Sequence, residues 1–253
     1  CRGGAIVTAT EWNTWRDQRL RGTTAPHGIA ALALTAWLGP DAEPVDGLPG
    51  RWRLEAGGPI IGDGFSPEDG VAGGEVRLDA GQEHAFGDVI ARRFDRDGTV
   101  ALRVIDPSAP SRTSIEGIDA FDYSDEWIVS GAFTPAAAAS TVDVIAVDGV
   151  SSVAEVGGRI ALELPTGPVE LTVTRNRAGA LSAVFSDASS TVDVYRFRFL
   201  GVAEPIDGVA TVDFTRAYLP PCAFSDEYVC PTPLPGNRWN VRVEAGEKNV
   251  VRV

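Results

Sequence analysis

The sequence has 253 residues, of which 44% are hydrophobic and 23% are charged, and its formal net charge is −13. This balance is typical of a globular protein and excludes intrinsic disorder and coiled coil. The acidic excess argues against a protein that reads phosphates, so we expect no nucleic-acid partner.

The start of the chain allows two interpretations. Its first residue is Cys1, and the sequence contains no methionine. A bacterial lipoprotein loses its signal peptide immediately before a cysteine that then carries the lipid, so Cys1 is a lipidation candidate and a possible lipid anchor. The alternative is a trimmed start that falls on a cysteine by chance. We therefore expect either a cytoplasmic protein or, if Cys1 is a processed terminus, an exported lipoprotein.

The first predicted element is a short helix over about residues 8–21. Thr8 and Glu11 have the spacing of a capping box, in which each residue satisfies a backbone amide of the other. Two tryptophans then fall near one face at helical spacing, which indicates docking on a core. Gly22 is expected to end the helix in a left-handed conformation.

The next apolar stretch, Ile29 to Leu38, is closed by Gly39 and Pro40. It has about half of the roughly 20 apolar residues needed to cross a bilayer, so we expect no transmembrane segment. Periodicity does not decide whether it forms a short helix or a buried strand.

From Arg51 onward the hydrophobic period changes to two. Segments such as RWRLEA, TVALRVI, WIVSGAF and PVELTVTR alternate apolar and polar residues, and turn signals such as Asp97-Gly98 separate them. The pattern predicts a mainly β fold, an antiparallel sandwich or barrel with the short N-terminal helix.

Domain organisation follows from the connections. No linker is long enough to separate independent domains. An alanine run at Pro135 to Ser140 marks either a boundary or one helical turn. We expect a single domain over residues 1–253, with β-rich halves at about 51–135 and 140–253.

The most unusual composition lies between Asp213 and Lys248. The blocks of interest are Asp213-Phe214, Arg216-Ala217-Tyr218, Pro220 to Phe224, Cys230-Pro231, Asn237-Arg238 and Glu244 to Lys248. With these blocks in this order, the chain resembles the bacterial domain-of-unknown-function 1684 family. Weaker similarity extends upstream, through Ser186 to Ser190 and Arg198-Phe199-Leu200. The resemblance implies a fold and a motif, without an established activity.

Cys222 and Cys230 lie near the two shoulders of a proline-rich loop in this stretch. Consecutive prolines keep such a segment extended and out of a central strand. The two cysteines are a disulfide candidate in an exported protein and two buried thiols in a cytosolic one, and a reactive thiol is a third alternative. A metal site would need two more ligands, and His27 and His84 are both far away in sequence, so we expect no metal and no other cofactor.

A charged and polar set surrounds this loop. Guanidinium groups bind carboxylates and phosphates bidentately, which favours a site for a small polar or anionic ligand. The candidate ligand-binding residues are Arg216, Tyr218, Asn237, Arg238 and Glu244. The alternative is an internal salt-bridge network that satisfies the loop backbone and locks the C-terminal strands.

Two functions remain open. The first is a binding or structural module with a polar site at this Cys/Arg loop. The alternative is a hydrolase- or lyase-type enzyme in which a carboxylate acts as base and a phenol or ammonium group acts as acid. Its candidate catalytic residues are Asp213, Tyr218, Glu247 and Lys248.

Overall fold

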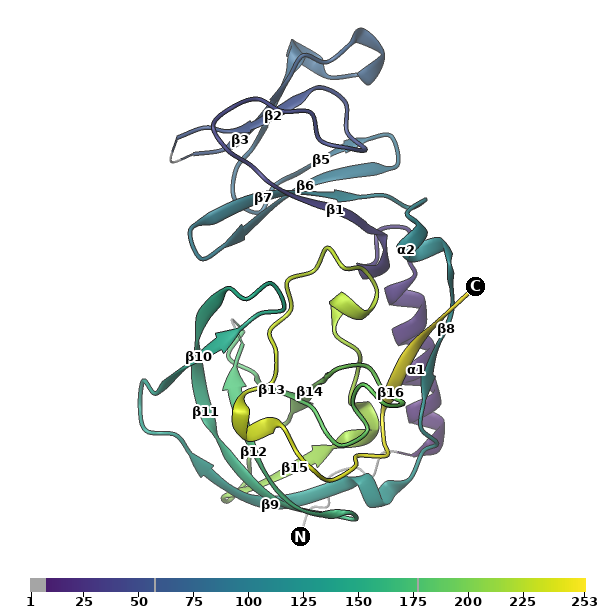
Figure 1. Cartoon of the computed structure of the whole chain (residues 1–253), viewed down its shortest axis with the longest axis vertical. Coiled ribbons are helices and arrows are strands. Elements are labelled where there is room, and N and C mark those ends of the chain that lie inside the picture. Colours follow the sequence, from purple (N-terminus) through teal and green to yellow (C-terminus); the bar gives the residue numbers. More distant parts are fainter. Residues whose placement is uncertain (1–7, 57, 177) are drawn as a thin grey trace. The chain divides into compact units, whose positions relative to one another are not determined.

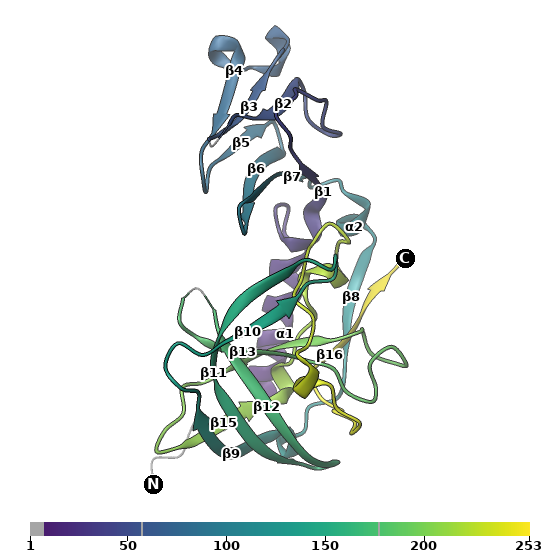
Figure 2. The same cartoon turned by 60° about the vertical axis from the view of Figure 1, so that its left-hand side comes forward.

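A computed structural model of the chain describes residues 8–56, 58–176 and 178–253. Antiparallel strands dominate, with one helix near the start, which confirms the predicted fold class (Figure 1 and Figure 2). The described residues form two compact units: unit 1 comprises 8–20, 116–223 and 229–253, and unit 2 comprises 21–115 and 224–228. The single-domain expectation stays a prediction, because two such units can still fold as one domain.

Unit 2 consists of antiparallel sheets in the strand orders β1-β7-β6-β5 and β2-β3-β4. The bounds are β1 Leu32–Trp37, β2 Arg51–Leu54, β3 Ile60–Asp63, β4 Glu75–Leu78, β5 Glu83–Phe86, β6 Val89–Arg96 and β7 Thr99–Ile105, followed by the short helix α2, Pro110–Thr113. Trp52 is fully buried in its core, with its ring edge-on to Phe65 and Phe86. The undecided stretch from Ile29 begins with one 3-10 turn and continues as β1, so most of it is a strand.

Unit 1 is built on a larger sheet in the order β14-β13-β12-β11-β9-β15, with β10 paired to β11. This sheet curls into half a barrel (Figure 1). The bounds are β9 Ile128–Pro135, β10 Thr141–Ile145, β11 Ser151–Leu164, β12 Gly167–Arg175, β13 Leu181–Phe185, β14 Arg198–Val202 and β15 Val209–Asp213. A separate ladder pairs β8, Ile115–Ala120, with β16, Glu247–Arg252. The alanine run between β9 and β10 is an irregular turn rather than a helical one.

The predicted helix is α1, Ala9–Thr23, and its capping box is confirmed. The backbone amide of Thr8 donates to Glu11 Oε2 at 2.8 Å, and that of Glu11 donates to Thr8 Oγ1 at 3.2 Å. The prediction for the other end is wrong, because Gly22 lies inside the helix. Within the described ranges, none of the helices combines the length and apolar character that crossing a bilayer requires.

Strand β11 changes face at a bulge. Its register with β12 shifts between Val156 and Gly158, so one extra residue, Gly157, stands in the strand. Even-numbered residues from 160 to 164 point into the core, whereas those from 152 to 156 line cavities on the opposite face. A Cβ on Gly157 would lie 2.3 Å from Leu181 Cδ2, so a larger residue there would force the Leu181 side chain to move.

Candidate functional site

The face of the unit 1 sheet opposite its core carries a cavity of about 380 Å³, which we call the Tyr218 cavity. Its floor consists of the non-core side chains of β12 and β13, which alternate with the buried ones as the period of two requires. Strands β10 and β11 form one wall of the cavity. A proline-rich segment that contains Pro231, Thr232 and Leu234, the covering segment, lies over the cavity. The lining residues are Val144, Ser152, Ala154, Thr172, Thr174, Asn176, Ser182, Ala183, Val184, Phe199, Tyr218, Pro231, Thr232, Leu234 and Asn237.

The covering segment is fastened to the end of β10 by its backbone. Val147 N donates to the carbonyl of Cys230 at 2.9 Å, and Thr232 N donates to the carbonyl of Ile145 at 2.8 Å. Pro231, which lies between Cys230 and Thr232, forms an isolated β-bridge with Ala146. The prolines keep this stretch extended, and the hydrogen bonds on either side of Pro231 hold it over the sheet. Backbone hydrogen bonds within unit 1 therefore hold the cavity in shape.

Asn237 forms part of the floor and is almost completely buried. Its Oδ1 accepts from Thr172 N at 2.9 Å, and its Nδ2 donates to the carbonyls of Thr172 at 2.8 Å and Val184 at 3.1 Å. Strands β12 and β13 pair only at Thr174 with Ser182 and at Arg175 with Leu181. Beyond that point the Asn237 amide bridges the two strands in place of a ladder hydrogen bond.

Tyr218 lines the cavity and carries a hydroxyl group. Its ring lies edge-on to Phe199 at 5.8 Å, and the guanidinium of Arg19 lies 5.0 Å from the ring centre. Burial raises the pKa of the Tyr218 phenol, so the hydroxyl keeps its proton at neutral pH. Within the described part of the chain, that hydroxyl has no hydrogen-bond partner.

The chemistry of the lining is neutral. Hydroxyls and amides alternate with valine, alanine, leucine and aromatic surfaces, and none of the described residues that line the cavity carries a charge. An ion transferred into such surroundings loses its hydration without gaining a counter-ion. The cavity is therefore suited to an uncharged molecule with an apolar body and hydrogen-bonding groups.

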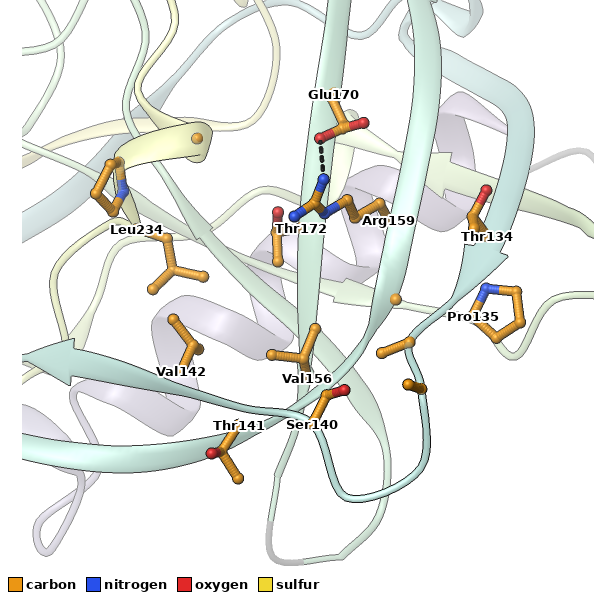
Figure 3. A pocket seen from close by; sticks show the side chains of 15 residues that line it. Thr134, Pro135, Ser140, Thr141, Val142, Val156, Arg159, Glu170, Thr172 and Leu234 are labelled. Carbon is orange, nitrogen blue, oxygen red and sulfur yellow. Dashed lines mark ion pairs between the residues drawn. The ribbon is translucent and has the colours of Figure 1, made fainter.

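A second cavity of about 590 Å³ adjoins the first and shares Thr172 and Leu234 with it. Figure 3 shows Arg159 and Glu170 in this second cavity, on adjacent strands and paired. The Nη1–Oε1 distance is 3.5 Å, and both side chains are more than half exposed, so water screens the pair strongly.

Three of the predicted ligand-binding residues are not part of the Tyr218 cavity. Arg216 lies beside Asp213, with 3.5 Å between Nε and Oδ2. Arg238 donates from Nε and Nη2 to the carbonyl of Pro233, at 3.2 and 3.1 Å. Glu244 accepts from the partly exposed Arg242 at 3.2 Å. Each of these charged side chains interacts with a residue no more than five positions away in the sequence.

Two of the candidate catalytic residues, Tyr218 and Glu247, share Arg19 as a neighbour, whereas Asp213 and Lys248 have neighbours of their own. Asp213 caps the turn that follows it by accepting from Thr215 N at 3.0 Å. Glu247, 1% exposed, accepts from Arg19 Nε at 3.1 Å and from Leu219 N at 2.7 Å. Burial raises the pKa of Glu247, and Arg19 opposes that shift. Lys248 Nζ lies 2.9 Å from Asp119.

The two described cysteines are brought together as buried free thiols. Cys222 N donates to Cys230 Sγ at 3.3 Å. The disulfide stays a prediction, and the lipidation candidate, Cys1, lies outside the described residues. Among the described residues, no group of three or more histidines, cysteines or carboxylates is placed to hold a metal ion.

Residues 113–248 match the model of a family described as "Protein of unknown function (DUF1684)". The match spans more than half of the 253 residues. The chain belongs to the DUF1684 family. The resemblance inferred from the sequence is thereby confirmed.

The DUF1684 chain is also similar to an uncharacterized protein of Haloarcula marismortui whose structure was determined in solution by NMR. The two sequences are 25% identical, the similarity covers 53% of this chain and 76% of that one, and the TM-score is 0.43. No curated protein matches the chain.

One buried ion pair within the DUF1684 match was not predicted from the sequence. Arg198 and Asp187 have fully buried side chains with 3.2 Å between Nη2 and Oδ1. Burial lowers the pKa of Arg198, and Asp187 opposes that shift. Both residues lie in upstream blocks that carry the family resemblance, which is the signal that points to them. Their pairing depends on the fold, because eleven positions separate them.

Proposed function

We propose that this DUF1684 protein is a binding module for an uncharged small molecule held in the Tyr218 cavity. The observation that carries the proposal is a cavity lined by uncharged residues, among them the motif residue Tyr218, whose hydroxyl makes no hydrogen bond to another described residue. A ligand carbonyl, ether or hydroxyl would accept from Tyr218, and the apolar surfaces of Val184, Phe199 and Leu234 would contact its body.

The proposal keeps the first function predicted from the sequence and narrows its small polar or anionic ligand to an uncharged one. The anionic alternative relied on Arg216 and Arg238, which interact with neighbouring parts of the chain. A neutral ligand relies instead on Tyr218 and on the wall and floor strands. Asn237 supports that floor, because its amide is already used by the backbone of β12 and β13.

The charge of the ligand is testable with two fluorescent probes that share one ring system. N-phenyl-naphthylamine is uncharged, and anilinonaphthalene sulfonate carries a sulfonate. We expect the uncharged probe to bind at least roughly tenfold more tightly, which is about 1.4 kcal/mol. Titrations followed by probe fluorescence measure both dissociation constants. Equal or tighter binding of the sulfonate would contradict a neutral site.

The place of binding is testable with two neighbouring substitutions on β11. Ala154 lines the cavity, whereas Val153 points to the other face and is 69% exposed. We expect Ala154→Phe to fill the cavity and remove most binding of the uncharged probe, and Val153→Phe to leave binding unchanged. Circular dichroism melting confirms that both variants are folded. Unchanged binding by a folded Ala154→Phe protein would place the ligand elsewhere.

A further inference from the structure

A cluster of two thiols, a phenol and a guanidinium lies in unit 1, apart from the residues that line the Tyr218 cavity. Cys222 and Cys230 are joined by the amide-to-sulfur contact described above. The hydroxyl of Tyr195 lies 3.0 Å from the carbonyl oxygen of Cys222 and 3.5 Å from its Sγ. Arg196 Nη2 donates to that hydroxyl at 3.0 Å, and its guanidinium lies 5.3 Å from the Tyr195 ring centre.

The cluster stabilises the thiolate form of Cys222. A hydrogen bond from Cys230, followed by one from Tyr195 and the charge of Arg196, lowers the pKa of Cys222 to about 7, and burial opposes the shift. Burial is also the main reason that the pKa of Tyr195 rises to about 12, so this phenol remains a proton donor. A lowered pKa increases the thiolate fraction of Cys222 near neutral pH, and the thiolate is the nucleophilic form.

Burial limits what can reach the thiols. Cys222 and Cys230 are 4% and 5% exposed. A bulky disulfide reagent would have to displace the surrounding loop to reach either sulfur. A hydroperoxide is little larger than water and needs only a small opening. The geometry therefore favours a small peroxide over a thiol–disulfide exchange partner.

We propose that Cys222 and Cys230 form a hydroperoxide-reactive thiol pair in which Cys222 attacks and Cys230 resolves. The Cys222 thiolate sulfur attacks one peroxide oxygen, the O–O bond breaks, and hydroxide (or alkoxide) leaves. Cys222 is then a sulfenic acid. Cys230 sulfur attacks the Cys222 sulfur, the S–O bond breaks, and the departing hydroxide takes the Cys230 proton to form water. Two thiols lose two electrons and two protons in total, and hydrogen peroxide is reduced to two waters, or an organic hydroperoxide to one water and one alcohol.

The assignment of roles is tested with hydrogen peroxide and dimedone, which traps sulfenic acids. All variants carry Cys1→Ser, so that Cys222 and Cys230 are the only thiols. We expect the Cys222/Cys230 protein to lose both thiols and become lighter by two hydrogens in mass spectrometry, with little trapping. Cys230→Ser should stop at the sulfenic acid and give a dimedone adduct on Cys222. Cys222→Ser should give little adduct on Cys230.

The pKa of the Cys222 thiol is measured separately, from the far-ultraviolet absorbance of the thiolate as a function of pH. We expect a midpoint near pH 7 that disappears in Cys222→Ser and moves upward in Tyr195→Phe. If the midpoint returned to an ordinary value of about 8.5, oxidation at pH 7 would slow roughly threefold, because the smaller thiolate fraction outweighs its greater nucleophilicity. A midpoint above 8.5 before substitution, or an adduct predominantly on Cys230, would overturn the proposal.

Discussion

Replacing Arg198 with methionine is expected to lower the free energy of unfolding by about 3–5 kcal/mol. The guanidinium donates to the carbonyls of Val243, at 3.0 Å, and Ala245, and it pairs with Asp187. Asp187 in turn accepts from Val243 N at 2.6 Å and from Ser189 Oγ at 2.8 Å. Without Arg198, the Asp187 carboxylate would stay buried without its counter-ion, and two carbonyls would lose their donor.

Urea unfolding of four proteins measures this effect and the coupling behind it. The parent chain is compared with Arg198→Met, with Asp187→Asn and with the double variant. The double variant should cost less than the sum of the two single ones, because it leaves no isolated buried charge. Arg242→Met is the matched control, since Arg242 pairs with Asp193 at a partly exposed position and should contribute about 1 kcal/mol or less. A loss of similar size for Arg198 and Arg242 would contradict the buried-pair account.

Asn237→Ala is expected to cost about 2–4 kcal/mol. The substitution removes the three hydrogen bonds that join Thr172 and Val184 where β12 and β13 part. The backbone groups left behind lie under the covering segment, and each unpaired buried group costs about 1–3 kcal/mol before relaxation.

The matched control for this prediction is Asn249→Ala. Asn249 Nδ2 makes a hydrogen bond to the carbonyl of Asp193 at 2.8 Å, at an exposed position where water can replace it. Its loss should cost about 1 kcal/mol or less. Hydrogen exchange at Thr172 gives a second readout, because its amide should exchange faster in Asn237→Ala while amides in unit 2 keep their rates. Unchanged protection at Thr172 would contradict the bridging role.

Local patterns predicted the parts of the fold that depend on near neighbours. The capping box needs only Thr8 and Glu11, so it could be inferred from spacing. Alternation likewise located most strands. The helix end was predicted at Gly22, but α1 continues to Thr23, which is 2% exposed. Thr23 is buried by tertiary structure, and a glycine in the sequence gives no information about such burial.

The predicted ligand-binding residues and the lining of the Tyr218 cavity have Tyr218 and Asn237 in common, whereas the predicted arginines do not line the cavity. Composition drew attention to arginines, yet the direction of a guanidinium depends on the local turn, and Arg238 folds back to a carbonyl five positions earlier. Asn237 is important because two strands separate beside it, and sequence contains no signal for the place of that separation. Tyr218 was predicted as a site residue, and it lines the cavity.

The bulge at Gly157 has a consequence for how sequences of this family can vary. Because it reverses which side chains face the core, substitutions at even-numbered positions before it change the cavities and those at even-numbered positions from 160 to 164 change the core. A change in length is different. Deleting Gly157 would restore simple alternation and turn one half of β11 inside out, exposing Ile160 and Leu162 or burying Ser152. Relatives that keep this strand should therefore differ here by exchange of residues, with insertions and deletions confined to the turns at its two ends.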